Sequence, residues 1–248
     1  MSILVFDTET TSLDKPFCYN IGYVIADNGN IVKRADFVVE QIWHNLPLFK
    51  SAYYADKRPI YVNAMKARKT IMDKFGYICQ QMIRDIKTYS IKSAYAYNSP
   101  FDEKVFEFNS DWFKCSNPFD LIPVYDIRGY AHNFICNTEE YIGFCEKNQL
   151  FTDSGNYSTT AEALFKYLTK DASFEEAHTA LADSEIETDI LLECFRKGAT
   201  EETAYPVKFS FPREVEKTLN IIKDKQSIGF FTYKKITINK ERTKIVLK

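Results

Sequence analysis

The chain has 248 residues, 45% of them hydrophobic and 27% charged, which is the composition of a soluble globular protein with a substantial core. Its six cysteines lie far apart and form no CxxC pair, which argues against a zinc or disulfide framework and favours a reducing cytoplasm. The net charge of −2 argues against indiscriminate coating of nucleic acid, and we find neither the basic start of a secretion signal nor the roughly 18 apolar residues of a membrane span.

The first 40 residues predict three strands arranged as a meander. Alternation of apolar side chains places these strands at residues 2–9, 21–26 and 31–40. Residues 27–30, Asp-Asn-Gly-Asn, favour a tight hairpin turn between the second and the third strand. In the first strand the twofold side-chain period puts Asp7 and Glu9 on one face, at the end of an otherwise apolar segment.

Helices and strands alternate from residue 70 onward. Helical periodicity covers residues 70–87, 101–112, 127–147, 160–169 and 179–197. Further strands are predicted at 91–97 and 121–125. This order of elements indicates an α/β fold with one mixed sheet flanked by helices. The main domain is expected to span residues 1–200, followed by an extension over 201–248.

The extension differs from the main domain in charge. Residues 207–248 hold 11 Lys or Arg and 4 acidic residues, a balance of +7 that leaves −9 for residues 1–206. A helix at 213–223 and a hairpin of 229–238 with 243–247 are predicted there. Basic side chains mixed with aromatic ones suit a groove for single-stranded nucleic acid. A lysine-faced hairpin packed on the main domain is an equally good interpretation.

Several carboxylates stand where a metal ion could bind, although each has a simpler explanation. Asp7 and Glu9 suit a divalent cation, but a D-x-E pattern arises by chance about once in such a composition. Asp102 falls in the first turn of a predicted helix, where a carboxylate complements the helix dipole. Asp126 precedes another helix, and there we predict a capping role only.

Asp183 is harder to explain as a surface residue. Steps of three or four residues along the predicted helix lead from Asp183 to Ile186 or Glu187 and then to Ile190, so these residues form one inward-facing stripe. A carboxylate on such a stripe is costly unless it is paired or metal-bound. His178 lies five residues earlier, just before the helix begins, and a surface histidine is the simple alternative there. The case for a site therefore rests on these residues taken together, in their order along the chain. This ordered set is the pair Asp7 and Glu9 on the first strand, Asp102 behind a later strand, and His178 with Asp183 at the start of a late helix.

Four carboxylates that meet at one point would repel one another unless cations neutralised them. Oxygen-only ligands select hard ions such as Mg²⁺ or Mn²⁺, and two such ions about 3.5–4 Å apart can hold the attacking and leaving oxygens of a phosphoryl displacement. A histidine can then remove a proton from the attacking water. The ordered set predicts metal-dependent phosphodiester hydrolysis.

Three segments of the chain resemble the motifs of the DEDDh, or DnaQ-like, 3′→5′ exonucleases, a family that includes the epsilon subunit of DNA polymerase III, ribonuclease T, oligoribonuclease and the TREX enzymes. The segments are residues 6–11 (FDTETT), 97–102 (YNSPFD) and 178–183 (HTALAD). The resemblance spans about residues 2–197. It implies an RNase H-like fold with a five-stranded mixed sheet.

The resemblance also implies roles for individual residues. Two Mg²⁺ ions, for which Mn²⁺ can substitute, would be held by Asp7, Glu9, Asp102 and Asp183. His178 would be the general base, and nucleoside 5′-monophosphates would be released from a 3′ end. Nucleotide binding is assigned by the same resemblance to Thr10, Leu13, Asn98 and Phe101.

Two positions depart from the family pattern. Ser12 stands where the family has a glycine, and Tyr97 stands where it has a histidine, so the nucleotide contacts are expected to differ more than the metal ligands. Single-stranded DNA is the leading substrate and RNA the alternative. A non-catalytic nucleic-acid or polymerase-binding module is a further alternative. Some relatives dimerise or bind a polymerase, and the sequence does not decide between these partners.

Overall fold

A six-stranded mixed sheet forms the centre of the computed structural model, which describes residues 2–204. In spatial order its strands are β4 (Ile71–Asp73), β3 (Asn30–Val39), β2 (Cys18–Asp27), β1 (Ser2–Thr10), β5 (Ala94–Ala96) and β6 (Val124–Asp126). The pairs β1–β2 and β2–β3 are antiparallel, whereas the pairs β3–β4, β1–β5 and β5–β6 are parallel. The helix and hairpin predicted for residues 207–248 lie outside the described residues.

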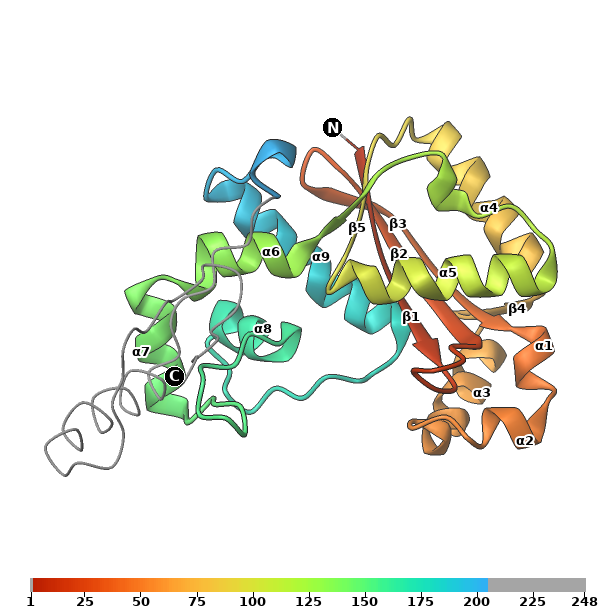
Figure 1. Ribbon diagram of the computed structural model, residues 1–248, viewed down its shortest axis with the longest axis horizontal. Coiled ribbons are helices and arrows are strands. Elements are labelled where there is room, and N and C mark those ends of the chain that lie inside the picture. Colours follow the sequence, from red (N-terminus) through yellow and green to blue (C-terminus); the bar gives the residue numbers. More distant parts are fainter. Residues whose placement is uncertain (1, 205–248) are drawn as a thin grey trace, which may run out of the picture.

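Helices cover both faces of the sheet. They are α1 (Glu40–Trp43), α2 (Leu46–Phe49), α3 (Arg58–Lys66), α4 (Phe75–Thr88), α5 (Ser99–Phe113), α6 (Ile127–Ala131), α7 (Glu139–Asn148), α8 (Ala161–Thr169) and α9 (Ala180–Arg196). Figure 1 shows α1–α4 on the right of the sheet in this view and α6–α8 on its left. Among residues 2–204, none of the helices has the length and apolarity needed to cross a bilayer.

The central strand β1 is buried on both of its faces. Leu4 and Phe6 pack with residues of α4 and α5, and the Phe6 ring lies 5.7 Å from that of Phe106. Ile3 and Val5 pack on the opposite face, with residues of α6 and α9. The predicted alternation is therefore confirmed. Because the side-chain period of a strand is two, Asp7 and Glu9 continue the Ile3 and Val5 row toward α9.

The predicted hairpin turn between β2 and β3 is confirmed. Asn28 and Gly29 both have left-handed backbones, with φ of 48° and 80°. Positive φ at both central residues defines the type I′ turn, whose twist matches that of the strands it joins.

Gly22 of β2 allows α9 to approach the sheet at backbone distance. A Cβ at Gly22 would lie 2.1 Å from the nitrogen of Leu181 and 2.2 Å from the carbonyl carbon of Ala180. We expect Gly22→Ala to lower the free energy of unfolding by about 3 kcal/mol, because the first turn of α9 must move. Urea denaturation measures this change. Gly143→Ala is the control, since its Cβ would meet nothing within 4 Å, and equal midpoints for Gly22→Ala and wild type would contradict the close approach.

The prediction of one helix over residues 70–87 is wrong at its start. Residues 71–73 pair in parallel with β3 and form β4, and the helix begins only at Phe75. Ile71 has the spacing of the helical stripe, but its side chain is 56% exposed and does not belong to the core. This strand makes the sheet six-stranded instead of five-stranded.

The prediction of one helix over residues 127–147 is also corrected. The structure has α6, a π-helical turn at His132–Cys136 and then α7, which begins after Thr138. The Thr138 hydroxyl accepts a hydrogen bond from the Tyr141 backbone N–H, so it caps a new helix inside the predicted one. The capping role predicted for Asp126 is confirmed, because its carboxylate accepts the Arg128 N–H at 2.9 Å.

The remaining differences concern boundaries. β5 and β6 contain three residues each, fewer than the strands predicted at 91–97 and 121–125. Proline at position 123 has no N–H to donate to a ladder, and β6 begins directly after it. No elements are predicted between residues 41 and 69, where the structure has α1, α2 and α3.

Candidate active site

Asp7, Glu9 and Asp183 meet where the end of β1 faces the first turn of α9. Each of the three offers a carboxylate oxygen, and these oxygens lie within 4.8 Å of one another. The first turn of α9 is fixed to β2 by two hydrogen bonds. The Ala180 N–H donates to Asn20 Oδ1 at 2.9 Å, and the Ser184 hydroxyl donates to the Gly22 carbonyl at 3.0 Å.

Asp102 is brought beside this cluster by α5, although it does not belong to the group whose oxygens lie within 4.8 Å of one another. It lies in the first turn of that helix, is 2% exposed, and accepts a hydrogen bond of 2.6 Å from the Thr8 hydroxyl of β1. Burial raises the pKa of Asp102 to about 7, although the Thr8 hydrogen bond lowers it. The charge of Asp102 is also the strongest of the neighbouring charges that act on Asp7.

The carboxyl groups at this place disfavour one another's ionisation. Burial raises the pKa of Asp7 well above its usual range, and the charges of neighbouring carboxylates add to this effect. Burial and the charge of Asp183 raise the pKa of Glu9 to about 8. Burial raises the pKa of Asp183 to about 7, while the ammonium of Lys57 lowers it. Such raised pKa values are typical of carboxylates arranged around a cation.

The oxygens fit a hard divalent cation. Asp183 Oδ1 is buried and accepts no hydrogen bond from any group in residues 2–204. A buried carboxylate oxygen without a donor is costly unless a cation takes the donor's place. Since every ligand atom in the set is a carboxylate oxygen, Mg²⁺ and Mn²⁺ suit it better than zinc or copper.

Glu187 is an additional buried carboxylate at the site that the sequence did not identify. It is 4% exposed, and its Oε2 accepts the Tyr97 backbone N–H at 3.1 Å. Burial and then the charge of Asp102 raise its pKa well above the usual range. A signal was present, because Glu187 follows Asp183 by four residues on the inward stripe of α9.

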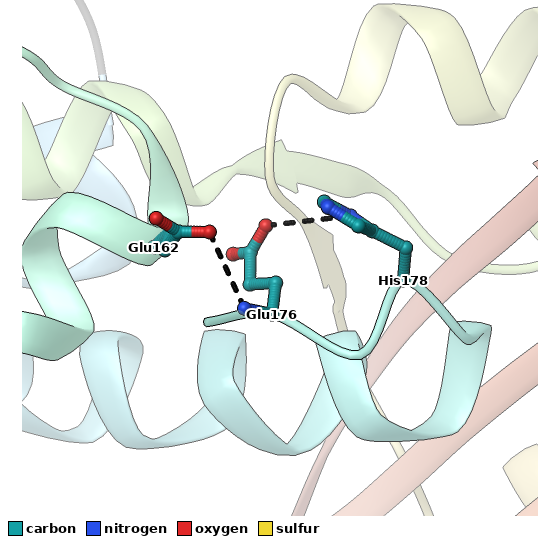
Figure 2. A group of neighbouring side chains, drawn as sticks. All are labelled: Glu162, Glu176 and His178. Carbon is teal, nitrogen blue, oxygen red and sulfur yellow. Dashed lines mark hydrogen bonds and ion pairs between the residues drawn. The ribbon is translucent and has the colours of Figure 1, made fainter. Parts of the chain in front are cut away.

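His178 lies on the loop that leads from α8 into α9, as predicted. Its Nδ1 is 3.7 Å from Glu176 Oε2, and Glu162 of α8 lies beyond Glu176 (Figure 2). The imidazole stacks on Tyr54, with ring centroids 4.6 Å apart and planes 12° from parallel. Burial lowers the pKa of His178, and the charge of Lys57 lowers it further. The ring is consequently neutral at pH 7 and able to accept a proton.

The residues assigned to nucleotide binding are close in sequence to the carboxylates, since Thr10 follows Glu9 and Phe101 precedes Asp102. Thr10 ends β1, and Leu13, three residues further on, is 76% exposed. Asn98 precedes α5 with a left-handed backbone, φ 64°, while Phe101 packs partly against the core. Their contacts with a nucleotide stay a prediction.

The loop after β1 is compact although it carries Ser12 in place of glycine. The Ser12 hydroxyl accepts the Lys15 N–H at 3.2 Å and donates to the Lys15 carbonyl at 3.0 Å. Asn109 of α5 closes the loop by donating to the Pro16 carbonyl at 2.7 Å. Tyr97 donates its hydroxyl hydrogen to the Thr159 carbonyl.

No family model matches the chain, and no curated protein matches it by sequence. Solved structures of exonuclease I do match. The match to a crystal structure of SSB/exonuclease I in complex with the inhibitor CFAM has a TM-score of 0.52 at 13% identity and covers 93% of this chain and 46% of that chain. Another, concerned with processivity, has a TM-score of 0.50 at 14% identity with the same coverage. E. coli exonuclease I with a dT13 oligonucleotide has a TM-score of 0.49, also at 14% identity with that coverage.

The likeness to the first two structures concerns the fold. The chain has the mixed α/β architecture of the RNase H-like exonucleases, with a sheet flanked by helices. It spans less than half the length of the exonuclease I chains that it matches.

Proposed function

We propose that the protein is a metal-dependent 3′→5′ exonuclease of the DEDDh type. It hydrolyses the terminal phosphodiester bond of single-stranded DNA and releases nucleoside 5′-monophosphates. The observation that carries the proposal is the convergence of Asp7, Glu9 and Asp183 within 4.8 Å, with Asp102 beside them and a neutral histidine on the adjoining loop. The fold shared with exonuclease I supports it.

Asp7, Glu9, Asp102 and Asp183 would hold two Mg²⁺ ions in this proposal, and Mn²⁺ would substitute. When bound, the ions polarise the scissile phosphate and stabilise the charge that develops on the attacking and leaving oxygens. Where they are ionised and no cation is bound, the carboxylates would repel the substrate phosphate.

His178 has the role of general base. Its imidazole is neutral at pH 7 because burial and Lys57 lower its pKa. Glu176 Oε2 lies 3.7 Å from Nδ1, and in this proposal Nε2 would take the proton of the attacking water. His178 directly precedes the N-cap of α9, so the base and Asp183 are held by the same short segment.

The 3′ terminal nucleotide would lie against Thr10 and Leu13. Leu13, three residues after the end of β1, is 76% exposed, and an apolar side chain there can pack under a base. Asn98 and Phe101 would bound the nucleotide from the α5 side. Because packing under a base requires that the base be unpaired, we assign single strands as the substrate.

Labelled oligonucleotides test the proposal. With Mg²⁺, a 3′-labelled DNA strand should lose its label as a mononucleotide at once, whereas a 5′-labelled strand should shorten stepwise. EDTA should stop both reactions. An RNA strand of the same sequence measures the sugar preference, and we expect it to be degraded more slowly. Internal cleavage, or cleavage in EDTA, would contradict the assigned reaction.

A further inference from the structure

Two segments hold the loop that carries His178: the distant connection between β3 and β4, and the preceding helix α8. Tyr54 and Lys57 belong to the connection between β3 and β4, and Glu162 belongs to α8. Tyr54 stacks on the imidazole, and Lys57 donates a hydrogen bond from Nζ to the carbonyl of Ala177, 120 residues further along the chain. Glu162 Oε2 accepts the backbone N–H of Glu176 at 3.3 Å (Figure 2).

These contacts hold the backbone of His178 in an unfavourable conformation. His178 has φ of 50°, in the left-handed region that costs a non-glycine residue on the order of 1 kcal/mol. Such a conformation persists only where the surroundings fix it. Lys57 holds the peptide before His178, and Tyr54 fixes the plane of its ring.

The cluster of Glu162, Glu176 and His178 could be mistaken for a second metal site, because its ligand atoms also lie within 4.8 Å of one another. The oxygens of Glu162 are already engaged. Its Oε1 pairs with Lys166 Nζ at 2.6 Å, and its Oε2 accepts the Glu176 N–H. The cluster therefore supports the loop, and we assign no cation to it.

We infer that Tyr54 and Lys57 are positioning residues for the general base. The inference rests on the proposed function, in which His178 receives the proton of the attacking water. Tyr54 sets the orientation of the imidazole by stacking, and Lys57 sets its place by holding the Ala177 carbonyl. Lys57 Nζ also lies 4.6 Å from the centre of the Tyr54 ring, so the two residues support each other.

Electrostatics agree with this placement of Lys57. Its ammonium lowers the pKa of His178, adding to the effect of burial. It also offsets part of the rise that burial causes in the pKa of Glu9, Asp183 and Glu176. One cation thus acts on both the base and the carboxylate cluster.

Steady-state kinetics on oligonucleotide substrate test the inference. Lys57→Met and Tyr54→Leu should lower kcat about 10- to 100-fold and leave KM within about twofold, because a displaced base slows chemistry and not binding. Tyr54→Phe keeps the stacked ring, and Lys57→Arg keeps a donor, so both should stay close to wild type. Lys50→Met, directly after α2, is the control for loss of an exposed lysine.

Two kinetic outcomes would overturn the inference. A raised KM with unchanged kcat in Lys57→Met would make Lys57 a substrate-binding residue. Equal damage from Tyr54→Phe and Tyr54→Leu would show that the hydroxyl matters and the stacking does not.

Histidine NMR gives a readout that needs no activity. The chain has three histidines, so His178→Gln identifies the Hε1 signal of His178 in protein with ¹³C-labelled histidine. Tyr54→Leu and Lys57→Met should shift this signal and leave that of His44 in place. If wild type is inactive, the proposed function fails while the spectra still test the contacts. If wild type is active and the variants match it in kcat and spectrum, only the positioning role fails.

Discussion

Replacing Asp7 by asparagine is expected to lower kcat by more than about 10³-fold and yet to raise the stability of the metal-free protein. The loss of activity follows because Asp7 is the carboxylate that the other acids of the site surround. The gain in stability follows from the same arrangement, since the asparagine side chain carries no charge for those acids to repel. We expect about 2 kcal/mol, or about 4–8 °C in Tm, in EDTA at pH 7.5.

The sign of this effect depends on pH. The folded-state pKa of Asp7 lies above its unfolded value, so ionised Asp7 destabilises the folded protein. The cost is absent below the unfolded pKa near 3.9 and grows as pH rises toward the folded pKa. The advantage of Asp7→Asn should therefore be present at neutral pH and vanish near pH 4.

Thermal melts in EDTA and in Mg²⁺ measure both parts of this prediction. Mg²⁺ should raise the Tm of wild type and have much less effect on Asp7→Asn, because ligand binding stabilises only the protein that binds it. Asp111→Asn is the control, since that side chain is 89% exposed on α5 and does not belong to the carboxylate cluster. An Asp7→Asn protein less stable than wild type in EDTA would contradict the repulsion.

Replacing His178 by asparagine should lower kcat about 10²- to 10⁴-fold and leave Mg²⁺ binding in place. The imidazole is the group that accepts the proton, whereas the carboxylates that hold cations are unchanged. Burial and Lys57 lower the pKa of His178, so the wild-type rate should rise with pH through a midpoint below about 6.5 and level off by neutral pH.

Rate profiles between pH 5 and 9 test the role of His178. At saturating Mg²⁺, which would keep the carboxylates ionised, the variant should lose the acid limb that the wild type has, because the imidazole assigned to that limb is gone. His44→Asn is the control, since His44 is exposed and has no assigned role. A His178→Asn enzyme with wild-type kcat would remove the general-base assignment.

The parts of the site that depend on local periodicity were predictable from the sequence. Asp7 and Glu9 follow from the twofold period of β1, and Asp183 follows from the inward stripe of α9. Glu187 lies on that stripe as well, but its burial depends on how α9 packs on the sheet. A pattern alone does not tell a buried glutamate from one at the edge of the stripe.

The parts that depend on long-range pairing were not predictable. β4 is a strand only because its backbone pairs in parallel with β3. Its three residues do not by themselves predict a strand. Tyr54 and Lys57 reach His178 across more than 100 residues of chain, and nothing near either residue indicates that contact. Sequence patterns report the neighbours along the chain, whereas the support of the base is built from neighbours in space.

Crystals grown with Mn²⁺ and a nucleoside 5′-monophosphate test the central claim most directly. Anomalous scattering locates manganese without reference to any assumed ligand. We predict two manganese ions bound by Asp7, Glu9, Asp102 and Asp183, with the phosphate of the nucleotide beside them. Manganese bound only at Glu162, Glu176 and His178, or a nucleotide bound away from both clusters, would contradict the account.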